Sequence, residues 1–214
     1  GSAWLETLRV DPAYQGKGIG KAFYDRFLRF AAFQDVGSLR MYTGTSNVVS
    51  KGLAERYGFK LEASYRGASW KASALTGRDA EAEPFYRVGP QDAVAQLLPL
   101  AAAWDGHVVM NRPFYPANAG VFAAMARESK VYVQPASGSI CILGYRFFPG
   151  GGLHLALTAG DHRAVIRFAK QEVMRLGLPQ VTVMFPPAMS ELQQILEEEA
   201  FVVEGGDCIV MGRT

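Results

Sequence analysis

The sequence has little cysteine and histidine, no long apolar run and almost no net charge, and each shortage excludes a class of protein. Its 214 residues include two cysteines and three histidines without ligand spacing, so we expect reduced thiols, no disulfide framework and no bound metal. No apolar run reaches the length of a membrane span, and the first residues lack the regions of a signal peptide. A net charge of +2 gives no argument for nucleic acid. We therefore expect a cytoplasmic protein with neither a nucleic-acid nor a membrane partner.

What is present is an ordinary globular composition, 49% hydrophobic and 20% charged, in a chain long enough for one large or two small domains. Strand and helix patterns alternate along it, which predicts an α/β fold. A small, polar stretch at 67–83 is expected to be a loop. The expected strands are 4–10, 38–43, 59–65, 85–88, 130–134, 139–147, 153–157, 180–185, 201–204 and 208–211, and the expected helices are 18–33, 47–57, 90–102, 117–128, 161–176 and 189–199.

The order strand, helix, strand, helix, strand occurs twice, at 4–65 and at 153–204, which indicates an internal repeat. The elements at 85–147 precede only the second copy. We therefore expect two units, residues 1–83 and 84–214, with the first truncated on its N-terminal side and its sheet edge and apolar helix face left for a partner chain or an exchanged domain to cover. The matching segments are Arg40-Met41-Tyr42 with Val181-Thr182-Val183, and Tyr57-Gly58-Phe59 with Glu199-Ala200-Phe201.

The helix expected at 18–33 has apolar residues at spacings of four, four and three, which is one stripe of a helix. These are Ile19, Phe23, Phe27 and Phe30. A glycine-rich turn, Gln15-Gly16-Lys17-Gly18-Ile19-Gly20, stands immediately before and at the start of this helix. Glycines let the backbone approach a ligand closely, and the first amides of a helix favour a phosphate. Lys17 and Lys21 add positive charge, so we predict an anion site; the alternative is a tight turn that only starts the helix.

With its neighbours, this turn resembles the GCN5-related N-acetyltransferase (GNAT) family over about residues 4–66. The resemblance implies an α/β (α+β) fold of two units, each a mixed central sheet flanked by helices. The second unit is similar in element order, but its turn at 158–162 lacks the pyrophosphate loop. The residues that carry the resemblance are Leu5-Glu6-Thr7-Leu8-Arg9-Val10-Asp11-Pro12, Gln15-x-x-Gly18-x-Gly20, Asn47 and Tyr57-Gly58-Phe59.

The resemblance implies that the chain binds acetyl-CoA as cosubstrate and transfers the acetyl group to a primary amine of a small molecule or a peptide. Asn47 would hydrogen-bond the pantetheine arm, with which the backbone of Leu8, Arg9 and Val10 would pair like an added strand. A homodimer is among the expected assemblies. The pyrophosphate would be held by the amides of Gln15, Gly16, Lys17, Gly18, Ile19, Gly20 and Lys21.

Catalytic groups are harder to assign. Glu6 is the candidate base, because alternation on a strand places it on one face with positions 8 and 10; the alternative is an exposed carboxylate without a role. The family often has a tyrosine seven residues after the asparagine as general acid, where this chain has Ala54. Tyr57 is the nearest alternative acid, since it lies within about 60° of Ala54 around the helix. A second hypothesis is therefore a non-catalytic acyl-CoA-binding or interaction module.

Overall fold

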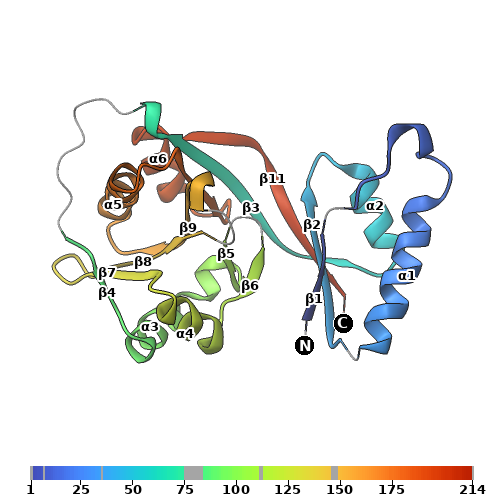
Figure 1. The fold of residues 1–214 in the computed structure, drawn as a ribbon, viewed down its shortest axis with the longest axis horizontal. Helices are drawn as coiled ribbons and strands as arrows, with labels where there is room; N and C mark the ends of the chain where they lie inside the picture. Colours follow the sequence, from blue (N-terminus) through green and yellow to red (C-terminus); the bar gives the residue numbers. More distant parts are fainter. Residues whose placement is uncertain are drawn as a thin grey trace. The chain divides into compact units, whose positions relative to one another are not determined.

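The structure is a computed structural model that describes residues 2–6, 8–34, 36–74, 84–110, 113–145 and 149–213. These residues form two compact units (Figure 1). Unit 1 comprises Gly1–Tyr65 and Gly206–Thr214, and unit 2 comprises Arg66–Gly205. The units differ from the predicted domains 1–83 and 84–214, because two long strands, β3 (Lys60–Lys71) and β11 (Val202–Arg213), each belong partly to both units. Residues 75–83, most of the predicted loop, lie outside the described residues.

Unit 1 is a small sheet with two helices packed on one face. Its β1 pairs in parallel with β2, and β2 pairs antiparallel with the last part of β11. The helices bury Tyr24 of α1 and Ala54 of α2 against alternate residues of β2 and β11. The elements are β1 (Ser2–Leu5), a 3-10 turn (Pro12–Tyr14), α1 (Ile19–Phe33), β2 (Ser38–Gly44), α2 (Val48–Arg56) and the adjoining parts of β3 and β11.

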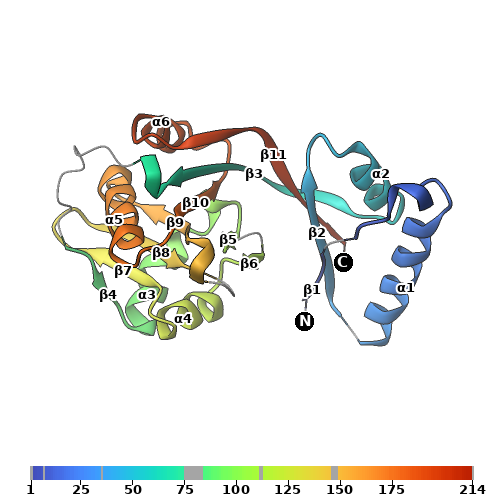
Figure 2. The ribbon, with the colours of Figure 1, turned by 45° about the horizontal axis from the view of Figure 1, so that its top comes forward.

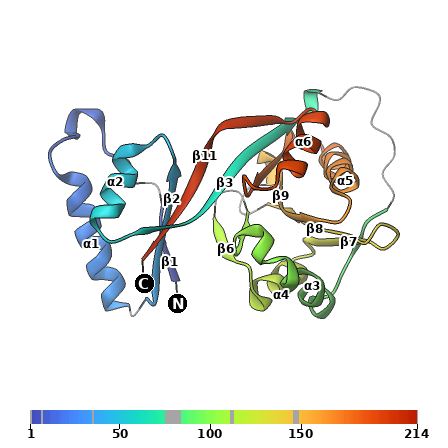
Figure 3. The ribbon, with the colours of Figure 1, turned by 180° about the vertical axis from the view of Figure 1, so that it is seen from behind.

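Unit 2 is a larger sheet covered on both faces. The strand order is β3-β10-β9-β8-β7-β4, with β10 between β3 and β9 (Figure 2). Helices α3 and α4 cover one face and α5 and α6 the other (Figures 1 and 3). The elements are β4 (Tyr86–Arg87), α3 (Pro90–Leu97), β5 (His107–Val109), β6 (Phe114–Pro116), α4 (Ala119–Arg127), β7 (Val131–Gln134), β8 (Ser139–Gly144), β9 (Leu153–Ala159), α5 (His162–Arg175), β10 (Gln180–Phe185) and α6 (Ser190–Glu198).

The repeated element order is present as β1-α1-β2-α2-β3 and β9-α5-β10-α6-β11. The second helix of each copy ends in the same way. Gly58 and Ala200 have positive φ angles of 82° and 62°. The next residue's amide reaches back to the helix, from Phe59 N to Ala54 O and from Phe201 N to Leu196 O, at 3.1 and 2.9 Å. This is the Schellman arrangement, and it turns each chain into its long strand.

The long strands are exchanged between the copies. Within unit 2, β3 of the first copy pairs antiparallel with β10 of the second, from Arg66↔Phe185 to Lys71↔Gln180. Within unit 1, β11 of the second copy pairs antiparallel with β2 of the first. Each compact unit is thus completed by a strand from the other half of the sequence. For this reason no single cut in the sequence separates the two units.

The predicted strands differ most from those observed at three places along the chain. The first was expected to span residues 4–10, but β1 ends at Leu5. The strand expected to end at residue 65 continues to Lys71 through residues predicted to be loop, because β10 supplies a partner for this stretch. The two short strands expected around Gly205-Gly206 are one strand, β11, in which neither glycine has a positive φ. In the last two cases small residues led to the prediction of a loop or turn, but pairing with a neighbouring strand keeps the chain extended there.

The predicted helix at 18–33 is confirmed, but its phenylalanine stripe is not the buried face. Tyr24 and Ala31 are buried, whereas Phe23 and Phe30 are 43% and 64% exposed. The side that packs on α2 and β2 is rotated away from the stripe. The helix expected at 90–102 is α3, followed by short 3-10 turns at Leu98–Leu100 and Ala102–Trp104. Strands β5 and β6 form an antiparallel pair that the sequence patterns missed.

Candidate functional site

A groove of about 850 Å³ lies within unit 1, between the segment that follows β1 and the first turns of α1 and α2. It brings together nine of the predicted cofactor-binding residues. Lys17 and Lys21 do not line it. The lining residues are Leu8, Arg9, Val10, Asp11, Pro12, Tyr14, Gln15, Gly16, Gly18, Ile19, Gly20, Asn47, Val49, Ser50 and Leu53.

One wall of the groove is backbone that has left the sheet. The parallel pairing of β1 with β2 stops at Leu5↔Met41, although β2 continues to Gly44. Residues 8–10 line the groove instead of extending the ladder. Gln15 Nε2 donates to the Val10 carbonyl at 3.0 Å, which ties this segment to the glycine-rich turn. An extended backbone that has separated from its neighbour has amide and carbonyl groups for a ligand to pair with.

The opposite wall is the start of α1. Gly18 is its N-cap residue in the left-handed conformation, at φ 80° and ψ 2°, and no side chain caps the helix. The first intrahelical bond runs from Ala22 N to Gly18 O, so helix geometry leaves the amides of residues 19–21 without intrahelical acceptors. A Cβ at Gly16 or Gly18 would meet no atom within 4 Å. These amides and the helix dipole together favour an anion.

Gly20 has a different role from the glycines before it. A Cβ at this position would lie 3.2 Å from Leu53 Cδ2 on α2. The residue therefore lets α1 and α2 approach closely at the groove.

Asn47, predicted to contact the pantetheine arm, is the N-cap of α2. Its Oδ1 accepts a hydrogen bond from Ser50 N at 3.1 Å, and the residue lines the groove. The capping bond occupies the carbonyl oxygen of the side chain, so the amide Nδ2 is the group suited to a ligand acceptor. Val49, Ser50 and Leu53 of the same helix also line the groove, and sequence analysis did not find them. They share only helical spacing, which does not distinguish a ligand wall from a core face.

The charges around the groove are mostly positive. Arg9, Lys17 and Lys21 carry positive charge, and within the described residues none of them forms an ion pair. Asp11 is the acidic residue of the lining, and its Oδ1 accepts from Ala13 N at 2.9 Å as the cap of a 3-10 turn. The arrangement matches a ligand with several negative charges.

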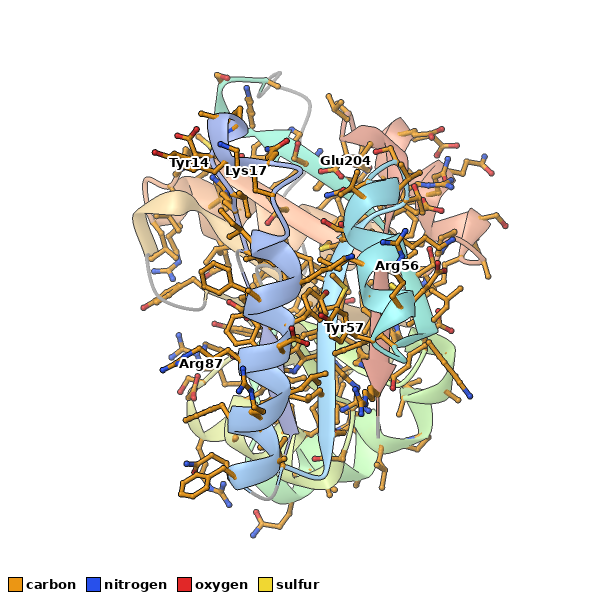
Figure 4. All side chains as sticks on the ribbon, turned by 90° about the vertical axis from the view of Figure 1, so that its right-hand side faces the viewer. Tyr14, Lys17, Arg56, Tyr57, Arg87 and Glu204 are labelled. Carbon is orange, nitrogen blue, oxygen red and sulfur yellow. The ribbon has the colours of Figure 1, made fainter. Side chains whose placement is uncertain are left out.

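The catalytic candidates are less well placed. Glu6 follows β1 directly, is exposed, and is not among the residues that line the groove. Tyr57 lies between α1 and α2 (Figure 4), where its hydroxyl donates to Asp25 Oδ1 at 2.9 Å and its ring stacks on Tyr24. Burial and the bond to the Asp25 carboxylate raise the pKa of Tyr57. This geometry favours a structural contact over proton donation, and Ala54 is fully buried in the core.

Residues 1–59 match the sequence model of the acetyltransferase (GNAT) family. The match covers residues 8–10, the glycine-rich turn and Asn47, which all line the groove. A search of curated proteins found no match. Solved GNAT structures have a similar fold, a mixed sheet flanked by helices.

Three solved structures illustrate the likeness of fold. A GCN5-related N-acetyltransferase from Sphaerobacter thermophilus aligns with a TM-score of 0.64 at 12% identity, over 95% of this chain and 70% of that one. A tandem GNAT protein from the clavulanic acid biosynthesis pathway aligns with a TM-score of 0.60 at 13% identity, over 99% of this chain and 74% of that one. A GNAT-family acetyltransferase from Colwellia psychrerythraea aligns with a TM-score of 0.57 at 11% identity, over 98% of this chain and 76% of that one.

The corresponding turn of the second copy is built differently. Asp161 is the N-cap of α5, and its Oδ1 accepts from Ala164 N at 3.0 Å. The Asp161 amide donates to Ser139 Oγ at 2.9 Å. A carboxylate of the chain therefore stands where α1 presents uncapped amides, and this turn is unsuited to a phosphate.

In the described part of the chain, no group of three or more histidine, cysteine, aspartate or glutamate side chains could hold a metal ion. None of the described helices is long and apolar enough to cross a membrane.

Proposed function

We propose that the groove of unit 1 binds acetyl-CoA and that the chain transfers the acetyl group to a primary amine of a small molecule or a peptide. The observation that carries the proposal is the uncapped start of α1 at Gly18, opposite backbone that has left the sheet. The family model over residues 1–59 supports the same cosubstrate. In this proposal the chain is a tandem of GNAT-like units, and the second unit is degenerate at its phosphate turn.

The ligand fits the groove in one direction. Its pyrophosphate would lie on the amides of residues 18–21, with Gly16 and Gly18 leaving space for close approach. Its pantetheine arm would pair with residues 8–10 and accept a bond from Asn47 Nδ2. The amine nitrogen then attacks the thioester carbonyl carbon, the carbon–sulfur bond breaks, and CoA leaves as the thiolate. The proton lost by the amine goes to a base or to water.

The binding step is tested by titration calorimetry with acetyl-CoA. We expect one site per chain, and at least tenfold weaker binding in Gly18→Glu, which adds bulk and negative charge to the anion site. Gly52→Glu is the control for added bulk and charge, because a Cβ at Gly52 on α2 meets nothing within 4 Å and the residue does not line the groove. Gly18→Ala is the control for the strain that any side chain has at φ 80°. Gly20→Glu is less informative, since it also disturbs the contact with Leu53. Equal affinity in Gly18→Glu and Gly52→Glu would contradict the proposed site.

The catalytic step is tested by the release of free CoA thiol with a panel of amines. Glu6 is the proposed base, because it follows β1 directly and stands two positions before the segment that lines the groove. We expect Glu6→Gln to lower kcat by about tenfold or more, within the range that a general base contributes, without weakening acetyl-CoA binding. Unchanged turnover would remove Glu6 from this role.

A second candidate function is a non-catalytic acyl-CoA-binding module. Two observations favour it: the position of the family's tyrosine is the buried Ala54, and the hydroxyl of Tyr57 is bonded to Asp25. This function predicts acetyl-CoA binding without thiol release for any amine. Turnover with one amine of the panel would decide for the acetyltransferase.

A further inference from the structure

We infer that a pocket of about 540 Å³ in unit 2 binds a small organic acid that has one carboxylate and an apolar body, with the carboxylate on Arg87. The pocket is formed by β4, the turn from α4 to β7, the end of β8, the start of β9 and the last turn of α5 (Figure 1). It lies wholly in unit 2 and shares no lining residue with the groove. The inference therefore does not rest on the proposed function.

The pocket lies far from the turn of unit 2 that corresponds to the glycine-rich turn of unit 1. That turn joins the end of β9 to the start of α5, whereas the pocket is lined by Leu153 at the start of β9 and by Arg175 at the end of α5. The seven residues of β9 separate the two places by about 20 Å at the usual rise of a strand. The pocket is therefore not a remnant of an acyl-CoA site.

The charges that line the pocket leave one cation without a partner. The cations are Arg87, Lys130 and Arg175, and the carboxylates are Glu128 and Glu172. Arg175 donates to Glu172 through two hydrogen bonds, Nε to Oε1 at 2.9 Å and Nη2 to Oε2 at 2.7 Å. Lys130 is paired with Glu128. Arg87 forms no ion pair with any residue in the described part of the chain, so a ligand with a single negative charge would balance the set.

Arg87 is positioned by the sheet and by an aromatic ring. It is directly opposite Tyr132 in the antiparallel pair of β4 and β7, and its Cζ lies 5.6 Å from the centroid of the Tyr132 ring. That ring packs on Phe168, with the two centroids 5.1 Å apart. A guanidinium over an aromatic ring keeps its N–H donors, which lie in its own plane, for other partners. Two parallel hydrogen bonds from such donors match a carboxylate.

Three leucines and two tyrosine rings also line the pocket. Leu143 and Leu153 are buried, whereas Leu176 and Tyr145 are partly exposed to solvent. A bound apolar body would remove the exposed leucine and ring from water, which is favourable in proportion to the apolar area covered. The volume of the pocket is within the range of small-molecule sites. An acid with an apolar body thus matches both the unpaired cation and the rest of the wall.

The charge contact is tested by ligand-observed NMR titration of the whole chain with 3-phenylpropionate and with its neutral amide, 3-phenylpropionamide. The two probes differ only in the carboxylate. We expect one saturable site that binds the acid at least tenfold more tightly, as for a charge-assisted hydrogen bond. Arg87→Met should remove this preference. Arg127→Met is the control for net charge and should keep it, because Arg127 is exposed on α4 and does not line the pocket.

The apolar contact is tested separately from the charge. Leu176→Ser should weaken the acid and the amide by the same factor, about threefold or more, because both probes have the same ring. Met174→Ser is the matched control, since Met174 is 43% exposed on the same helix, against 47% for Leu176, and does not line the pocket. It should leave both affinities unchanged. Equal loss in the two variants would contradict the apolar contact.

The remaining outcomes separate this site from the groove of unit 1. Equal binding of acid and amide, or a preference that survives Arg87→Met, would overturn the assignment of the carboxylate. The absence of saturable binding would overturn the pocket as a site for such acids. Gly18→Glu should bind 3-phenylpropionate with unchanged affinity, and weaker binding there would place the acid in the groove instead. Acetyl-CoA titration of the unmodified chain decides the proposed function independently of these results.

Discussion

Lowering the pH from 7.5 to 4.5 should destabilise unit 2 through one histidine. His154 is 4% exposed on β9, and its Nδ1 lies 2.8 Å from Thr182 Oγ1. Its Nε2 has no hydrogen-bond partner among the described residues. Burial lowers the pKa of His154 to about 4, although the backbone of Val109 acts in the opposite direction and raises this pKa. The folded chain therefore resists protonation that the unfolded chain accepts.

The sign and size of the effect follow from linkage. The pKa of His154 in the folded chain lies below the ordinary value of 6.5. The contribution of neutral His154 to the free energy of unfolding is therefore fully present above pH 6.5 and is lost as the pH falls from 6.5 to 4. Below pH 4 this contribution does not change further. The full difference of 2.5 pKa units corresponds to about 3.4 kcal/mol. At pH 5.5 the expected loss is about 1.4 kcal/mol, and at pH 4.5 about 2.5 kcal/mol.

The assay is urea unfolding followed by tryptophan fluorescence at pH 7.5, 5.5 and 4.5. Trp70 and Trp104 both belong to unit 2 and are about 1% exposed, so their emission reports on this unit. His154→Asn is the control, because asparagine keeps a polar side chain at this position but does not titrate. We expect the stability difference between the two proteins to shrink by about 2.5 kcal/mol between pH 7.5 and 4.5. An unchanged difference, or an NMR titration of His154 near 6.5, would refute the burial argument.

Two further perturbations have definite expected outcomes. Burial raises the pKa of Glu199, but the hydrogen bond and charge of Lys170, the hydrogen bond of Arg163 and the charge of Arg167 together bring it below its ordinary value. Unfolding should therefore become easier as the pH falls through that lowered pKa. Glu199→Gln should remove this pH dependence and cost about 3 kcal/mol in urea unfolding at pH 7, since Lys170 Nζ lies 3.0 Å from the buried Glu199 carboxylate. Phe33→Leu should leave calorimetric unfolding of unit 1 within about 0.5 kcal/mol, because Phe33 is 85% exposed. The matched Tyr24→Leu should cost about 2 kcal/mol, because Tyr24 is buried against Tyr57 and Phe59.

The sequence was sufficient for local features. The helix start at Gly18 and the helix end at Gly58 follow from backbone conformations that glycine adopts readily, and both glycines have positive φ in the structure. The grouping of residues 8–10, the glycine-rich turn and Asn47 into one groove also agrees with the resemblance. These features depend on a few neighbouring residues, so a local pattern carries enough information to predict them.

The sequence was insufficient for features that depend on a distant partner. Helical spacing shows that Phe23 and Phe30 share a face, but the side on which α2 and β2 pack decides that this face is exposed. The alternation of residues along β3 also does not identify its partner strand, because that partner is β10, more than a hundred residues away in the sequence. Tyr14 lines the groove but was missed, because an aromatic ring in a turn has no periodic signal.

The contrast between the two copies shows how little sequence separates a ligand site from a closed turn. Both copies have a strand followed by a glycine and a helix, yet Gly18 leaves the first amides of α1 uncapped, whereas the Asp161 carboxylate caps α5. Replacing Asp161 by glycine would not restore a site, because the amide of residue 161 is bonded to Ser139 Oγ and a Cβ at Gly160 would lie 2.7 Å from Ser139 Cα. The neighbouring strand β8 thus occupies the space that a phosphate needs. The phosphate site therefore requires both an uncapped helix and an open approach, and the described turns of the two copies combine these only at Gly16 and Gly18.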